Sequence, residues 1–363
     1  MSAIRELLEK AVSLNASDVH IKPGKEPVFR VSGDLVDSGF EALTAEQVAA
    51  IVDDILPAHI RARFEEEREA DFSHNEEGVG RFRVNIFCAQ NAPTIAMRYV
   101  KDRIPTFEEL RLPLQLKELA NAERGIILIS GTTGSGKSTT MAAIIGEMNR
   151  RHRNRIITIE DPVEYVFKDE QSVITQREVG LDTLSFQNAL IHVLRQDPDV
   201  IFIGEMRDQI SIRTALLAAE TGHLVMSTLH AGTCALAVPR ILDVFPESEQ
   251  DQIRMAMAGN LYAIICQRLI PDVQGSVVPA VEILINTPTV RKLLEKNQLD
   301  VIGAAIETGG EDGMQTFNQA IYKLIRSGLI TEKEGMRYAT NPEQLRMNLQ
   351  GIFLDEGKRI LST

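Results

Sequence analysis

The sequence predicts a two-domain α/β protein, with a small α+β domain followed by a larger domain built on a mostly parallel sheet. Its 363 residues are enough for two domains. After residue 113 apolar strands alternate with helices, the pattern of a sheet covered on both faces. The stretch 101–113, KDRIPTFEELRLP, has two prolines and little periodicity. We therefore place the domains at 1–100 and 114–363, with 101–113 as the linker.

Helical and extended patterns are both present in the first domain. Apolar residues at helical spacing predict an amphipathic helix over 3–14. Thr44 and Gln47 form a capping box that begins a second helix, which ends before Pro57. Short strands are expected at Val19–Ile21, Val28–Val31, Arg81–Phe87 and Thr94–Val100, with a turn at 32–34.

Five apolar strands are expected in the second domain, at Ile126–Ser130, Arg155–Ile159, Val200–Ile203, Leu224–Ser227 and Val277–Ile285. A helix over Ser138–Asn149 follows the first of them. Near the C-terminus, Thr287 and Pro288 supply the cap and first-turn proline of a helix. Another helix spans Gln315–Ser327 and ends at Gly328.

Composition and charge narrow the class of protein. The formal net charge of -12 disfavours a non-specific nucleic-acid binder, although Arg150–Arg155 is a local basic patch. Three scattered cysteines without a CxxC pair do not support a zinc knuckle or a dithiol redox site, and they fit a reducing cytosol. We expect neither a signal peptide nor a membrane helix, which needs about 20 apolar residues.

The segment GTTGSGKS at Gly131–Ser138 matches the phosphate-binding pattern G-x-x-x-x-G-K-[ST]. It lies between an apolar strand and a helix, the context that the motif requires. Backbone amides and the helix N-terminus would hold phosphates, Lys137 would reach the β- and γ-phosphates of ATP, and Ser138 would bind Mg²⁺. The expected nucleotide-binding residues are Gly131, Thr132, Thr133, Gly134, Ser135, Gly136, Lys137, Ser138 and Thr139.

Carboxylates follow two later strands. Glu205 ends the apolar run in VIFIGEMRD, where it can hold Mg²⁺ or its water shell. The segment TIEDPVEY at Thr158–Tyr165 carries Glu160, Asp161 and Glu164. Hydrolysis needs a carboxylate that orients or deprotonates the attacking water, and we choose Glu164 for this, with Glu160 as the second choice. On pattern alone, a solvated acidic turn is an equally good interpretation of this segment.

Two histidines and four arginines are further candidates for contacts with the nucleotide. His223 and His230 flank an apolar strand seven residues apart, so they are poor joint metal ligands; His230 could sense the γ-phosphate, whereas His223 fits an ordinary structural histidine. Arg81, Arg83, Arg195 and Arg207 are candidates for stabilising charge on a transferring phosphoryl group. Each arginine alone is more often a surface ion-pair residue.

Taken in order, these segments resemble the secretion ATPase superfamily of type II secretion and type IV pilus motors. The N-terminal matches are ASDVHI (Ala16–Ile21), FRVSGDL (Phe29–Leu35) and GRFRVNIF (Gly80–Phe87). The Walker A box is Gly131–Ser138, the Asp box Ile159–Glu164, the Walker B box Val200–Asp208 and the His box Thr221–His230. One box would be weak evidence, but four in this order are highly specific.

The resemblance implies a PAS-like N-terminal domain, a RecA-like ATPase domain and a homohexamer that hydrolyses ATP with Mg²⁺. It assigns catalysis to Glu164, Glu205, Lys137, His230 and Arg195, and nucleotide contacts to Arg81, Arg83 and His223. It also implies a cytoplasmic protein that docks at the inner membrane through a pilus platform protein and other pilus assembly proteins, with no nucleic-acid partner.

Two features bear on the branch of the family. The GMQT segment within Gly309–Ala320 resembles pilus retraction ATPases, and the tetracysteine zinc site of extension ATPases has no counterpart. Thr289-Val290 stand where retraction motors carry Ala-Ile, so an accessory retraction ATPase also fits the sequence. Another secretion-system ATPase is a further alternative. A RecA-like nucleic-acid translocase, a regulator that binds ATP without acting as a motor and a small-molecule kinase are weaker interpretations, in that order.

Overall fold

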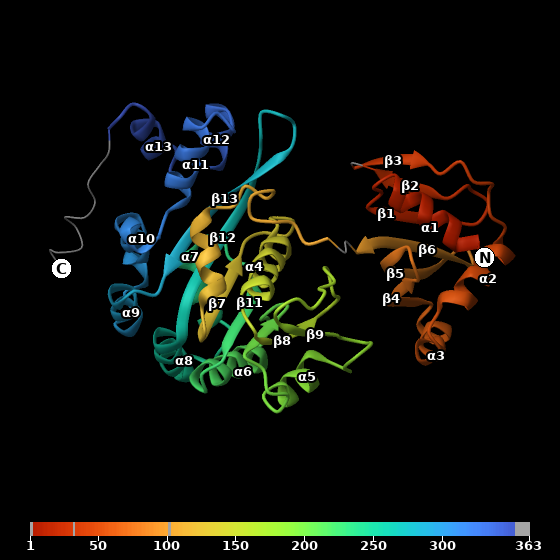
Figure 1. Ribbon diagram of the computed structural model, residues 1–363, viewed down its shortest axis with the longest axis horizontal. Helices are drawn as coiled ribbons and strands as arrows, with labels where there is room; N and C mark the ends of the chain where they lie inside the picture. The colour runs from red at the N-terminus through yellow and green to blue at the C-terminus, as the bar shows by residue number, and fades with distance from the viewer. Residues whose placement is uncertain (1–2, 32, 101–102, 353–363) are drawn as a thin grey trace. The chain divides into compact units, whose positions relative to one another are not determined.

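The computed structural model describes residues 3–31, 33–100 and 103–352, which form two compact units (Figure 1). The first unit comprises the N-terminal residues up to Arg103 together with Asp161–Val166 and Glu178–Asp182. The second comprises Ile104–Glu160, Phe167–Arg177 and the residues from Thr183 onward. Two short segments at the ends of strands of the second unit's sheet are thus counted with the first unit.

The first unit is built on a six-stranded sheet in the order β3-β2-β1-β6-β5-β4, and all neighbouring pairs are antiparallel. Helices α1 and α2 bury their apolar faces in the same core as the sheet. The bounds are α1 (Ala3–Ser13), β1 (Asp18–Ile21), β2 (Val28–Val31), β3 (Asp34–Asp37), α2 (Ala45–Ile55), α3 (Ala58–Glu67), β4 (Glu69–Glu76), β5 (Gly80–Ala89) and β6 (Ala92–Val100).

Local signals locate this unit's elements well. The Thr44 hydroxyl accepts the Gln47 N–H, and the Gln47 side chain accepts the Thr44 N–H, so the predicted capping box is confirmed. Ile4, Leu7 and Leu8 are buried on one face of α1, as their spacing predicts. The predicted turn at 32–34 includes Ser32, which lies outside the described residues.

The second unit is built on a seven-stranded sheet in the order β13-β12-β7-β11-β10-β8-β9. Strands β12, β7, β11, β10 and β8 run parallel to one another, and β13 is antiparallel to β12. The bounds are β7 (Gly125–Ser130), β8 (Arg155–Glu160), β9 (Val173–Glu178), β10 (Val200–Ile203), β11 (Leu224–Leu229), β12 (Leu261–Pro271) and β13 (Val277–Ile285). The predicted mostly parallel sheet is confirmed.

Central strands β10 and β11 are buried along their whole length, so both faces of the sheet are covered. The helices are α4 (Lys137–Arg151), α5 (Phe186–Val193), α6 (Gln209–Glu220), α7 (Cys234–Leu242), α8 (Glu247–Asn260), α9 (Pro288–Glu295), α10 (Ile302–Thr308), α11 (Phe317–Arg326), α12 (Glu332–Tyr338) and α13 (Pro342–Leu349). Short 3₁₀ helices lie at Leu114–Asn121, Leu299–Val301 and Gly310–Asp312.

Two strands of this sheet, β9 and β12, were not predicted. Strand β12 begins at Leu261 directly after α8 ends at Asn260, so no turn residues separate the helical pattern from the extended one. Part of the stretch predicted as linker also packs in this unit, because Phe107 and Leu112 are buried in its core. Among the described residues, no helix has both the length and the apolar character needed to cross a membrane.

Candidate functional site

The parallel strands of the second unit bring the predicted motifs to one edge of its sheet. In register, β7 ends at Ser130, β8 reaches Glu160, β10 ends at Ile203 and β11 ends at Leu229. The phosphate loop, Glu205 and His230 follow directly. Ligands of open parallel sheets bind at this carboxyl edge, so the fold places three of the four boxes where a nucleotide would be held.

The loop Gly131–Ser138 contains glycines whose backbone conformation other residues rarely adopt. Gly131 has φ 150° and Gly136 has φ 85°. A Cβ on Gly131 would lie 2.5 Å from the Ser135 hydroxyl oxygen and 2.6 Å from the Gln267 carbonyl oxygen. The glycines are therefore required both by backbone conformation and by lack of space.

This loop fits a phosphate group. The Ser135 hydroxyl is buried and has no hydrogen-bond partner among the described residues. Lys137 Nζ donates to the carbonyl oxygens of Gly131 and Thr132 at 3.0 and 3.2 Å, so its ammonium lies over the loop. Helix α4 begins at Lys137, and its first N–H groups and dipole favour an anion there.

Glu205 lies within the electrostatic reach of Lys137. Burial alone would raise the pKa of Glu205, but the Arg207 hydrogen bond and the charges of Arg207, His230 and Lys137 outweigh it, so its pKa is lowered. Arg207 Nη2 lies 2.5 Å from the Glu205 carboxylate. Glu205 is therefore ionised at neutral pH, as a ligand of Mg²⁺ or of its water shell must be. Ser138, the other predicted metal ligand, is half-buried in the first turn of α4.

The two carboxylates considered as general base have different surroundings. Glu160 is buried at the end of β8 and accepts hydrogen bonds from Thr158 Oγ1 at 2.6 Å and Gln176 Nε2 at 3.1 Å. Glu164 is exposed. The first environment holds its carboxylate in place, and the second leaves Glu164 accessible to water and to a partner group.

The two histidines lie at opposite edges of the sheet. His230 follows β11, and its Nε2 lies 3.4 Å from Glu205 Oε1. His223 precedes β11, and its Nδ1 contacts Thr221 Oγ1 and the Ala218 carbonyl oxygen, both at 3.0 Å. The six residues of β11 separate the two by about 20 Å. The structure thus brings His230, but not His223, to the phosphate-loop edge of its own chain.

The predicted arginines are scattered. Within the first unit, Arg81 Nη2 donates to Glu178 Oε2 at 2.5 Å. The exposed Arg83 lines a small pocket of that unit together with Asp71, Asp161 and Glu178. Arg195 is exposed just after α5. Because carboxylates already surround Arg81 and Arg83, any contact of these arginines with phosphate would compete with them.

The sequence analysis missed two buried polar residues that hydrogen-bond to residues of the predicted motifs or near them, Glu178 and Gln267. Buried Glu178 accepts the Ser73 hydroxyl at 2.6 Å and the Val163 N–H at 3.1 Å in addition to Arg81. Buried Gln267 contacts the phosphate loop from β12. Each partner is more than ten positions away along the chain, so only the tertiary fold brings the groups together. For Gln267 the one local signal was a polar residue inside the apolar strand β12.

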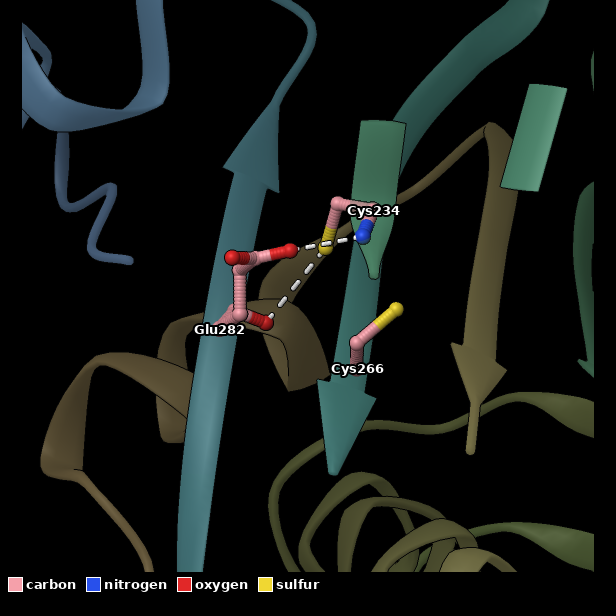
Figure 2. A group of neighbouring side chains, drawn as sticks. All are labelled: Cys234, Cys266 and Glu282. Atoms are coloured by element: carbon pink, nitrogen blue, oxygen red, sulfur yellow. Dashed lines mark hydrogen bonds between the residues drawn. The ribbon is translucent and has the colours of Figure 1, made fainter. Parts of the chain in front are cut away.

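The fold also gathers two of the three cysteines with a carboxylate, as Figure 2 shows. The ligand atoms of Cys234, Cys266 and Glu282 lie within 4.8 Å of one another, and all three residues are buried. Glu282 Oε1, however, already accepts the Cys234 N–H at 2.7 Å, and Oε2 accepts the Phe317 N–H at 3.4 Å. The carboxylate therefore caps the first turns of α7 and α11, and three protein ligands are fewer than the four of a structural zinc site.

Comparison with known proteins decides the family. The family described as "Type II/IV secretion system protein" matches residues 1–287. The chain belongs to this family. It is 41% identical over 340 residues to the type IV pilus retractation ATPase PilT of Pseudomonas aeruginosa, covering 94% of this chain and 99% of that one. It is 40% identical over 346 residues to the type IV pilus ATPase PilU of the same organism, covering 95% and 91%.

A solved structure of a family member agrees in fold. The crystal structure of the pilus retraction motor PilT with bound ADP superimposes with a TM-score of 0.88 at 42% sequence identity. The alignment covers 94% of this chain and 98% of that one. The predicted membership of the secretion ATPase superfamily is therefore confirmed along nearly the whole chain.

Proposed function

We propose that this secretion-family protein is an ATP-hydrolysing motor that drives retraction of type IV pili. The observation that carries the proposal is the meeting of Lys137, Glu205 and His230 at the carboxyl edge of one parallel sheet. The likeness to PilT along 94% of the chain supports it, and the ADP bound in the PilT crystal structure supports a nucleotide ligand. We infer further that residues 114–363, most of which lie in the second unit, form a RecA-like ATPase domain, and that residues 1–100, in the first unit, form a PAS-like domain.

The reaction is ATP and water to ADP and phosphate. The amides of the loop Gly131–Ser138 and the α4 N-terminus bind the phosphates, and Lys137 turns from the loop carbonyls to the β- and γ-phosphates. Ser138 and Glu205 would hold Mg²⁺, which would supply neutralising charge. His230 reports the γ-phosphate to Glu205, because the two side chains are already in contact.

Water activation falls to Glu164. Its carboxylate is exposed, whereas that of Glu160 is held by two hydrogen bonds, which suits a positioning role better than proton transfer. Arg81, Arg83 and Arg195 approach the phosphates when ATP is bound, from this or a neighbouring subunit. For Arg81 this requires its ion pair with Glu178 to open. Loss of the γ-phosphate on hydrolysis then weakens the clamp.

The working assembly is a cytoplasmic homohexamer docked on an inner-membrane pilus platform protein. His223 fits this assembly better as a contact to a neighbouring subunit's nucleotide than to its own, because it lies at the far edge of the sheet. A second candidate role, the accessory retraction ATPase, is favoured by the similar identity to PilU and by Thr289-Val290.

Deletion of the gene followed by imaging of pili tests the proposed role. We expect hyperpiliated cells that fail to retract pili, with retraction restored by the wild-type gene and not by a Lys137→Ala copy. Loss of pili would indicate an extension motor and contradict the proposal. Normal retraction that fails only under load would favour the accessory role.

A further inference from the structure

Gln267 stands beside the point where β7 becomes the phosphate loop. Strand β12 runs parallel to β7, and the last paired residues are Cys266 and Ser130. The next residue on β7's side is Gly131, and the next on β12 is Gln267, which is only 3% exposed. Its amide group is thus buried against the loop.

The oxygen and the nitrogen of this amide both make hydrogen bonds. Thr140 Oγ1 donates to Gln267 Oε1 at 2.7 Å, and Gln267 Nε2 donates to the Ser135 carbonyl oxygen at 2.7 Å. A hydroxyl can donate to the amide oxygen, but the amide NH₂ group can only donate, so the two contacts fix the orientation of the side chain. The Gln267 amide therefore joins the loop to the first turn of α4.

Fixing the Ser135 carbonyl also fixes the amide that follows it. In a planar trans peptide, the C=O of Ser135 and the N–H of Gly136 point in opposite directions. Because the Ser135 carbonyl points to Gln267, the Gly136 N–H points away from Gln267, to the other side of the loop. A loop that binds phosphate needs its N–H groups turned to one side before the ligand arrives.

The close packing of Gln267 also explains why two positions of the loop, 131 and 136, are glycine. A Cβ on Gly136 would lie 2.7 Å from Gln267 Nε2, and a Cβ on Gly131 would lie 2.6 Å from the Gln267 carbonyl oxygen. The loop is thus packed on Gln267 at both ends, and the glycines allow this close approach.

We propose that Gln267 is a positioning residue for nucleotide binding, which holds the loop with its amides turned to the phosphates. The proposal rests on the proposed function, since it assigns Gln267 to the same nucleotide site. It gives a role to a β12 residue that lies outside the four sequence boxes.

The test compares Gln267→Leu with Gln315→Leu in the full chain. Gln315 is also buried, and its amide donates to the Val281 carbonyl oxygen at 2.9 Å, but it does not contact the loop. We expect Gln267→Leu to raise the Kd for ADP about tenfold, the equivalent of about 1.4 kcal/mol. Most of this loss should fall on the KM for ATP rather than on kcat. Gln315→Leu should leave the Kd unchanged at a comparable melting temperature.

Two further variants keep the test decisive if Gln267→Leu folds poorly. Gln267→Glu keeps the shape and the bond from Thr140 but sets a carboxylate oxygen against the Ser135 carbonyl, so it should weaken ADP binding at least as much. Thr140→Val removes the donor to Gln267 Oε1 but keeps the bond from Nε2 to the Ser135 carbonyl, so its effect should be smaller and should vanish in a Gln267→Leu background. Wild-type ADP affinity in both Gln267 variants would overturn the inference. Failure of the wild-type protein to bind ADP would instead overturn the proposed function.

Discussion

At the scale of single residues, the sequence was sufficient to predict site residues that belong to a short local motif. Lys137, Glu205 and His230 each follow a strand of the same sheet, and the fold brings them to one edge. Gln267 and Glu178 could not be found in this way, because their partners lie far away along the chain. His223 belongs to a recognisable motif, yet the direction of β11 places it at the other edge.

The choice between Glu164 and Glu160 as general base is a prediction at this scale. Glu164→Gln should retain ATP binding and lower kcat about 10²-fold or more, because a positioned base contributes roughly 10²–10⁴-fold to a rate. Steady-state kinetics of the full chain, with nucleotide affinity measured separately, give both quantities.

Glu160→Gln is the matched control. It removes a buried charge but keeps one oxygen that can accept from Thr158 and Gln176, so turnover should change only a few-fold. Near-normal turnover in Glu164→Gln together with a collapse in Glu160→Gln would reverse the assignment.

At the scale of elements, caps and turns were predictable and sheet neighbours were not. Thr44 begins α2 and Thr287 begins α9, because both caps need only residues within one helical turn. The capping of α7 and α11 by Glu282 was not predictable, since that carboxylate comes from β13. Strand β12 was missed for a related reason, because a helix runs directly into it.

Glu282→Ala tests the importance of this shared cap. The substitution leaves two buried N–H groups without an acceptor, so we expect the free energy of unfolding to fall by about 3 kcal/mol. Glu282→Gln, which keeps one acceptor oxygen, should lose less. Denaturant unfolding measures both.

Glu311→Ala provides the reference, because Glu311 is an exposed acidic residue near α11. Its free energy of unfolding should match that of the wild type. If Glu282→Ala were as stable as Glu311→Ala, the two helices would be held by packing alone.

At the scale of the whole molecule, the order of the motifs along the chain predicted the family before any geometry was known. A single box would be weak evidence, but four boxes in this order are highly specific. The solved structure of PilT, which superimposes with a TM-score of 0.88, agrees with the predicted family.

The central claim is that the site at Lys137 hydrolyses ATP, and ATP turnover by the purified full-length protein tests it most directly. We expect steady-state release of phosphate in the presence of Mg²⁺, lowered at least about 10²-fold by Lys137→Ala, because the ammonium neutralises phosphate charge in the transition state. No turnover by the wild-type protein, or turnover unaffected by Lys137→Ala, would contradict the account.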